Sequence, residues 1–206
     1  MKRSILAVIS ALFFISMANA ESFDSVCKKL ALHPNMTGNF TQVKTIFAVN
    51  RSMKSSGTFI FSLDGIMWKT EKPFPSTMIV GMTSVKQTLA NGKETVIDAS
   101  SNQIFTSISS TLSAMFSGNA AVLNENFNVT FTSSDSEWNA VLEPKDEVVK
   151  KILTSLLISG KTLSNSADLN TIVMKEAVGD TITYNFTEQK YPKELTADEK
   201  AYFTSK

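Results

Sequence analysis

The sequence predicts a mainly β protein of the α+β class, built on a single curved antiparallel sheet or open barrel. Two observations favour this fold class. Strand-forming runs follow one another along most of the chain, and short turns such as Asp64-Gly65 and Asn91-Gly92 separate them. Clear helical spacing of apolar residues occurs before the strands and again between the middle strands, which leaves about nine to eleven strands for the sheet.

The N-terminus has the pattern of a secretory signal peptide. Met1-Lys2-Arg3 is basic, an apolar stretch follows, and Ala18-Asn19-Ala20 supplies the small-x-small cleavage pattern. The apolar stretch is shorter than the about 20 residues that a membrane-spanning helix needs. A lipid anchor would need a cysteine directly after this stretch, and Cys27 lies further along. We therefore expect residues 1–20 to be a signal peptide and residues 21–206 to form a single domain.

The first mature elements are predicted to be a helix and a meander of strands. The stretch Glu21–Leu32 is amphipathic, with apolar residues at helical spacing, and His33-Pro34 ends it. Thr37–Phe47 has the composition of a long strand, and its partner begins near Lys54 and runs into the hairpin at Asp64-Gly65. Further strands are expected at residues 77–81, 85–89 and 95–97.

The hairpin within Gly57–Pro75 carries many bulky apolar side chains. One face of its first strand presents Phe59, Phe61 and Leu63, and the return strand adds Ile66, Met67 and Trp68. So much apolar surface needs a cover, which is either an ordinary packed core or something that the protein binds.

The segment between Asp98 and Glu125 contains no charged residue. Apolar side chains recur in it at helical spacing from Ile104 to Phe116, and Gly118 stands where a C-terminal cap is expected. The remaining face is serine and threonine. A surface helix normally carries charges on its solvent side, so a helix without them is expected where both faces are covered at least part of the time.

The C-terminal half returns to strands. We expect them at residues 128–132, 137–143, 170–176 and 181–187, while residues 145–160 fit a short helix followed by a segment that is strand or helix by pattern alone. The last residues are polar, and we expect them to be peripheral.

Composition leaves little material for catalysis. The chain has one His, one Cys and a formal net charge of +1, which excludes an intramolecular disulfide, the usual transition-metal ligand sets and a basic nucleic-acid surface. No Gly-x-Ser-x-Gly elbow or phosphate-binding glycine loop is present. His33 sits at a helix end, and Cys27 is expected to be buried on its helix. We expect no enzyme activity, metal, cofactor or nucleic-acid partner, and we expect a monomer.

Several short motifs, in their order along the chain, resemble the outer-membrane lipoprotein carrier (LolA-like) family. They are a Phe-x-Gln strand, a Gly-led strand, a Trp followed closely by Pro, and two later segments. The corresponding stretches are Gly38-Asn39-Phe40-Thr41-Gln42, Ser56-Gly57-Thr58-Phe59, Met67-Trp68 with Lys72-Pro73, Glu143-Pro144-Lys145, and Gly179 to Tyr184.

This resemblance implies an unclosed β-barrel with a helical lid over a hydrophobic cavity. It also implies a carrier in the periplasm of a Gram-negative bacterium that moves acylated lipoproteins or lipids from the inner to the outer membrane, with an inner-membrane ABC-type releasing complex and an outer-membrane acceptor as partners. The lipid-binding candidates for cavity and lid are Phe23, Leu30, Phe40, Phe59, Phe61, Ile66, Trp68, Ile79, Phe105, Ile108, Leu112, Met115 and Phe116.

The chain departs from the family at one place. Better-known members carry an Arg-Pro between the Gly-led strand and the Trp, and that Arg is linked to lid closure, whereas Ser62-Leu63-Asp64-Gly65 stands here. The lid is therefore expected to close differently, or the cargo differs from a standard lipoprotein. Two alternatives to a carrier are a lipid-sensing or binding module of the envelope without cargo delivery, and a secreted enzyme, which would have to use His33.

Overall fold

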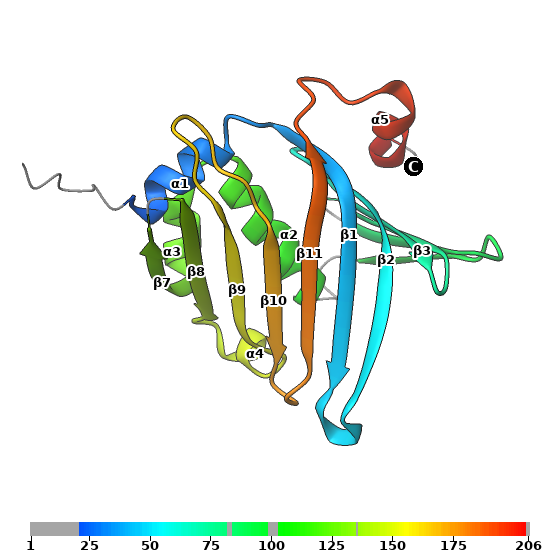
Figure 1. The fold of residues 1–206 in the computed structure, drawn as a ribbon. Coiled ribbons are helices and arrows are strands. Elements are labelled where there is room, and N and C mark those ends of the chain that lie inside the picture. Colours follow the sequence, from blue (N-terminus) through cyan, green and yellow to red (C-terminus); the bar gives the residue numbers. More distant parts are fainter. Residues whose placement is uncertain (1–20, 82–83, 99–102, 135, 205–206) are drawn as a thin grey trace, which may run out of the picture.

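A computed structural model describes residues 21–81, 84–98, 103–134 and 136–204, with only the backbone for residues 97–98 and 103–109 (Figure 1). Its strands form one eleven-stranded antiparallel sheet in the order β6-β5-β4-β3-β2-β1-β11-β10-β9-β8-β7. The sheet does not close into a barrel, because β6 and β7 remain as its two edges. The predicted fold class is confirmed.

The strands make two meanders that meet in the middle of the sheet. Strands β1 to β6 run outward in one direction, and β7 to β11 return from the opposite edge, so that β11 pairs with β1. Their bounds are β1 Asn35–Ile46, β2 Arg51–Ser62, β3 Gly65–Lys72, β4 Ser76–Val80, β5 Ser84–Leu89, β6 Glu94–Asp98, β7 Phe127–Ser133, β8 Glu137–Pro144, β9 Leu153–Lys161, β10 Thr171–Glu176 and β11 Thr181–Lys190.

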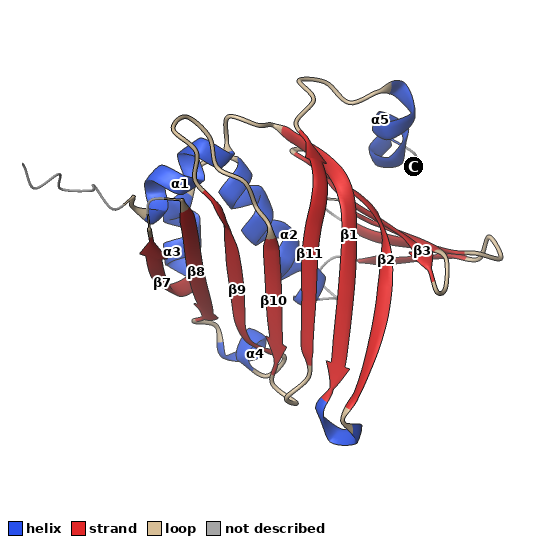
Figure 2. Cartoon of the chain, in the orientation of Figure 1, coloured by secondary structure: helices blue, strands red, loops and turns tan. Residues whose placement is uncertain are grey.

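Helices α1, α2 and α3 gather on one side of the sheet, and α5 stands apart from them near the C-terminus (Figure 2). The Ser22 hydroxyl caps α1 by accepting from the Ser25 amide at 3.2 Å. The helical elements are α1 Phe23–Leu30, the 3-10 turn η1 Phe47–Val49, α2 Gln103–Phe116, α3 Ala120–Asn126, α4 Glu147–Lys150 and α5 Ala197–Thr204.

The structure resolves the ambiguous region and corrects details of other elements. Residues 145–160 hold the short helix α4 and then strand β9, whose inner face is buried in the core. Helix α3 was not predicted, because only one turn of apolar spacing follows Gly118. The first hairpin turns at Leu63-Asp64, one residue earlier than predicted, since Ser62 pairs with Gly65.

The sheet is strongly curved across β3, β2, β1 and β11. Trp68 of β3 and Tyr184 of β11 are separated by two intervening strands, yet their ring centroids lie 5.8 Å apart. Neighbouring strands are about 4.8 Å apart, so rings on a flat sheet would not meet. Gly57 contributes to the bend, because the β2–β3 register shifts beside it and the β3 backbone passes directly over its Cα.

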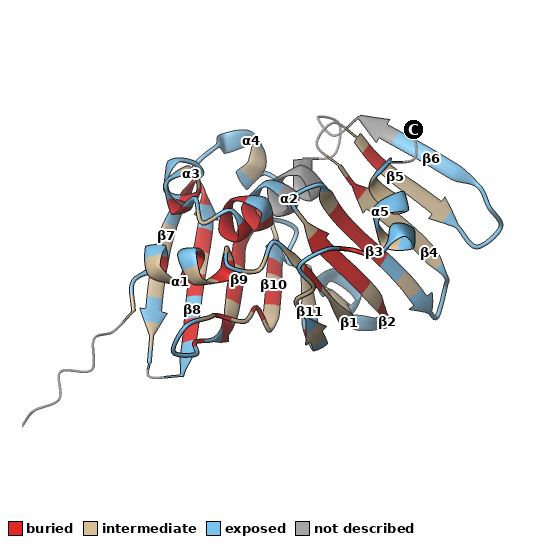
Figure 3. Cartoon of the chain, turned by 90° about the horizontal axis from the view of Figure 1, so that it is seen from above, coloured by how far each residue is buried: buried red, intermediate tan, exposed pale blue. Residues whose placement is uncertain are grey.

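Side-chain alternation separates an inner face from an outer face. The inner face is apolar along most strands and packs against α1, α2 and α3 in the main core (Figure 3). The outer face carries a smaller cluster in which Leu195, Tyr202 and Phe203 of the C-terminal region cover Ile60 and Met67. The expectation that the last residues are merely peripheral is thus wrong for this segment, because α5 shields apolar outer-face side chains from water.

Gly57→Ala should destabilise the fold, because the new methyl group would overlap the Lys69 carbonyl oxygen, and backbone cannot yield as a side chain can. We expect a loss of about 1–3 kcal/mol in the free energy of unfolding, measured by urea denaturation. Gly81→Ala is the matched control, since among the described residues its methyl group would meet the Ser84 carbonyl oxygen at an ordinary contact distance of 3.7 Å. Equal stability of the two variants would contradict the proposed close approach of β3.

Candidate functional site

Helix α2, which we call the lid, crosses the inner face of the sheet and is held at its C-terminal end by a tight cap. Gly118 has a φ of 71°, its amide bonds the Met115 carbonyl at 3.1 Å, and the Asn119 amide bonds the Ala114 carbonyl at 2.8 Å. These two bonds form a Schellman motif, which confirms the predicted cap. Leu112, Met115 and Phe116 of the lid are buried, whereas Ser113 is exposed.

The wall opposite the lid is a cluster of aromatic rings from four strands. Phe61 is its centre, with ring centroids 5.3 Å from Trp68, 5.4 Å from Phe186 and 6.0 Å from Phe116 of the lid. Phe59 lies 4.8 Å from Phe186 in an edge-on arrangement. Such edge contacts suit the quadrupoles of the rings. The lid therefore docks directly onto the aromatic wall.

The hollow between the wall and the described side chains of the lid is small, about 40 Å³. It is bordered by Leu112, Ser113 and Phe116 of the lid and by residues 61–63, 65–66 and Gly81 of the sheet. Small-molecule pockets usually have about 300–1,000 Å³, whereas 40 Å³ holds roughly one water molecule. A large apolar ligand therefore does not fit in this hollow while the lid stays on the wall.

Ser62 to Gly65, where the family resemblance leads us to expect an Arg, is a tight turn in this chain. The Ser62 hydroxyl accepts from the Asp64 amide at 3.2 Å and donates to the Gly65 carbonyl at 3.3 Å, which satisfies the turn internally. Leu63 and Ile66, beside this turn, face the hollow under the lid. Leu112 and Phe116 of the lid border the same hollow, so apolar lid side chains lie close to this turn.

Most of the residues predicted from the sequence to line the cavity share one cluster. Two of the lid candidates, Phe105 and Ile108, lie in the part of α2 whose side chains are outside the described structure. Ile79 needs a correction, because it lies on the outer face and packs against the α5 cluster rather than facing the lid. The candidates that belong to the main core are Phe23, Leu30, Phe40, Phe59, Phe61, Ile66, Trp68, Leu112, Met115 and Phe116.

Sequence reasoning missed the contribution of β11 to the wall. Tyr184 and Phe186 contact Trp68, Phe61 and Phe59 through the curvature of the sheet. Their alternation with threonine was a usable signal for a half-buried strand. What the sequence could not supply was the β1–β11 pairing, which joins segments more than a hundred residues apart.

The edge of the inner face, beyond the aromatic wall, is polar and charged. Lys44 forms ion pairs with Glu176 at 3.4 Å and Asp180 at 3.8 Å, and the Asp180 carboxylate also accepts from the Phe47 amide at 3.0 Å. Tyr184 lies between this rim and the wall. Burial, with a smaller contribution from Glu176, raises the pKa of Tyr184 to about 12, so its phenol stays neutral at physiological pH.

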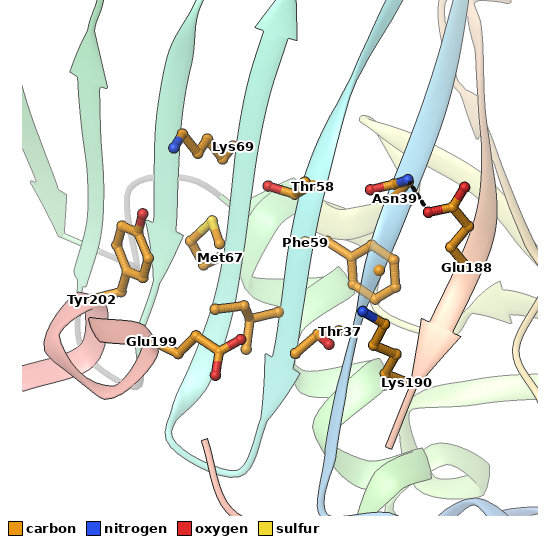
Figure 4. A pocket seen from close by; sticks show the side chains of 12 residues that line it. Thr37, Asn39, Thr58, Phe59, Met67, Lys69, Glu188, Lys190, Glu199 and Tyr202 are labelled. Carbon is orange, nitrogen blue, oxygen red and sulfur yellow. Dashed lines mark hydrogen bonds between the residues drawn. The ribbon is translucent and has the colours of Figure 1, made fainter. Parts of the chain in front are cut away.

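Another hollow lies on the outer face, between α5 and strands β1, β2, β3 and β11 (Figure 4). It has about 320 Å³ and a rim of charged and polar groups, including Lys69, Lys190 and Glu188, whose carboxylate accepts from Asn39 at 2.9 Å. Such a rim suits polar molecules rather than hydrocarbon. Within the described ranges, no three His, Cys, Asp or Glu residues come together as a metal site would require.

Solved structures that are similar to this chain include the following two. A DUF1329 family protein from Desulfovibrio piger has a TM-score of 0.51 at 8% sequence identity, over 88% of this chain and 94% of its own. A LolA superfamily protein from Nitrosomonas europaea has a TM-score of 0.49 at 10% identity, over 90% of this chain and 99% of its own. The first likeness shows that the fold is shared. Among curated proteins, none matches this sequence.

The model of the family described as "Outer membrane lipoprotein carrier protein LolA" matches residues 34–202. The chain belongs to the LolA family. The family resemblance predicted from the sequence is thereby confirmed. LolA family proteins are periplasmic carriers with a lipid- or lipoprotein-binding fold rather than enzymes. In the described part of this chain, no helix has the length and apolarity needed to cross a membrane.

Cys27 should resist thiol reagents as long as the protein is folded. It is fully buried on α1, and burial, assisted by the charge of Asp24, raises the pKa of its thiol to about 12. The ordinary pKa of a cysteine thiol is 9.0, so the thiolate fraction at pH 8 falls on the order of a thousandfold. We expect Ellman's reagent to label Cys27 only as fast as the protein unfolds. Rapid stoichiometric labelling without denaturant would contradict the burial of Cys27.

Proposed function

We propose that this LolA family protein carries acyl chains of lipoproteins or lipids across the periplasm, from the inner to the outer membrane. The observation that supports this most directly is the uncharged lid packed on an aromatic wall. The structure describes the lid in its docked position, with Leu112, Met115 and Phe116 buried against the inner face. A ligand that replaces the lid on that wall must itself be apolar.

The physical chemistry of acyl chains explains why a carrier is needed. Each methylene group transferred out of water gains about 0.8 kcal/mol, so an acyl chain does not leave a membrane for water unaided. A protein wall of Phe, Trp, Met and Leu supplies an alternative apolar surface. Weak shape specificity is useful there, because aromatic rings and methionine accommodate chains of different form and also release them.

Delivery requires partners at both membranes, and they belong to this proposal. Residues 1–20, with the pattern of a signal peptide, would direct export into the periplasm. An inner-membrane ABC-type complex would release the acylated cargo to the carrier, and an outer-membrane acceptor would bind it more tightly. We propose that the protein works as a monomer, since one chain supplies both the wall and the lid.

A charge on the inner face should weaken the binding of a fluorescent fatty-acyl probe. Met78→Glu places a carboxylate on the inner face of β4, beside Trp68, and an unpaired carboxylate next to hydrocarbon is strongly unfavourable. We expect the affinity to fall by about tenfold or more in a fluorescence titration. Thr77→Glu is the matched control, because Thr77 is next to Met78 on the same strand and faces outward. This variant should bind the probe as the wild type does.

Two results would contradict the proposal in different ways. An equal loss of probe affinity in Met78→Glu and Thr77→Glu would mean that the inner face has no special role in binding. A wild-type protein that binds no acyl probe, while it retains a stable envelope protein in a pull-down, would favour a sensing or binding module without cargo delivery.

A further inference from the structure

Trp68 places a hydrogen-bond donor inside the apolar interior without giving it an acceptor. Its side chain is 6% exposed, and its Nε1 has no hydrogen-bond partner among the described residues. Buried indole N–H groups usually find a partner, because an unpaired donor loses its hydration without compensation. An unpaired donor in a binding wall is therefore expected where a ligand supplies the acceptor.

The other tryptophan of the chain shows the usual arrangement. Trp138 is fully buried in β8, and its Nε1 donates to the main-chain carbonyl of Asp168 at 3.2 Å. Both indoles lie on the inner face of the same sheet. Trp68 is on β3, which contacts the lid, and Trp138 is on β8, in the half of the sheet over which α1 and α3 lie (Figure 3). The orphan donor thus coincides with the surface that the proposed cargo would use.

The lid itself carries a second unpaired polar group. Thr111 is 1% exposed, and its hydroxyl oxygen has no partner in the part of the chain that the structure describes. A helical threonine can donate to a carbonyl one turn earlier, and this one does not. Lid and wall therefore each contain an unsatisfied polar atom in the closed state.

The indole is held in a fixed place. Its ring centroid lies 5.3 Å from that of Phe61 in an edge-on contact and 5.8 Å from that of Tyr184. In the register of the sheet, Trp68 stands opposite Phe59 on β2 and Met78 on β4. None of these four residues carries a positive charge. A neutral acceptor is consequently favoured over a carboxylate, because an anion would remain unpaired there.

An acyl chain attached to cargo has one such group, the carbonyl oxygen of its ester or amide linkage. We propose that, once the lid has moved, Trp68 Nε1 donates a hydrogen bond to this carbonyl and so sets the depth at which the linkage rests. This inference rests on the proposed carrier function and specifies its ligand class. The site prefers ester- or amide-linked acyl chains over plain hydrocarbon of the same length.

The test compares two competitors that differ only in the acceptor. A long-chain fatty acid methyl ester and the alkane of equal length are each used to displace the fluorescent fatty-acyl probe. Trp68→Phe removes the N–H while keeping an aromatic ring, and it should lower the affinity for the ester about five- to tenfold, as expected for one hydrogen bond. Affinity for the alkane should change by less than about twofold. Trp138→Phe is the matched control and should leave both affinities unchanged.

The outcomes separate this inference from the function on which it rests. Equal weakening of ester and alkane in Trp68→Phe would overturn the hydrogen bond but leave the carrier function standing. A wild-type protein that binds neither ligand would overturn both.

A second measurement does not depend on the folding of Trp68→Phe. The chain contains two Trp, so Trp68 is the sole indole in Trp138→Phe. The ester should shift the fluorescence emission of Trp68 to longer wavelength than the alkane does, because the ester carbonyl accepts a hydrogen bond from the indole N–H. The same emission with both ligands would overturn the proposal.

Discussion

The curved sheet has an apolar inner face that must be covered whether or not a ligand is present. Helices α1 and α3 cover one half of it through side chains such as Phe23, Leu30 and Leu123. The lid α2 covers the aromatic half, where Phe61 touches Phe116. Because hydrophobic burial is not directional, another apolar surface can take the place of the lid. The absence of charge on α2 follows from this requirement, since a charged face could not change its surroundings freely.

The free energy needed to withdraw the lid from the wall is comparable to the free energy gained by burying an acyl chain there. Withdrawing Leu112, Met115 and Phe116 from the wall costs roughly 5–9 kcal/mol, at about 1.5–3 kcal/mol for each buried side chain. About ten methylene groups, at about 0.8 kcal/mol each, would offset that cost. If the protein carries acyl chains as proposed, long chains would exchange with the lid while short ones would not. The Ser62–Gly65 turn adds no ionic contact to this balance, so binding in this chain should depend little on salt.

The sequence predicted the fold class, the helix α1, the lid and most of the aromatic wall, because each of these has a local pattern. Alternation identified the apolar face of the first hairpin, and Gly118 marked the end of the lid. Ile79 was misplaced, since strand alternation alone does not say which face looks inward. Tyr184 and Phe186 were missed because the β1–β11 pairing and the curvature that brings Tyr184 to Trp68 depend on contacts between distant segments.

The central claim is that lid and ligand occupy the same wall in turn, and a cross-linked lid tests it most directly. Leu63 and Ser113 border the same hollow, both are exposed, and a short bis-maleimide can join cysteines at these positions while buried Cys27 stays unmodified. Leu63→Cys/Ser113→Cys should lose binding of the fluorescent fatty-acyl probe after cross-linking. The same variant, capped with N-ethylmaleimide, should keep it. Full probe affinity in the cross-linked protein would contradict the claim.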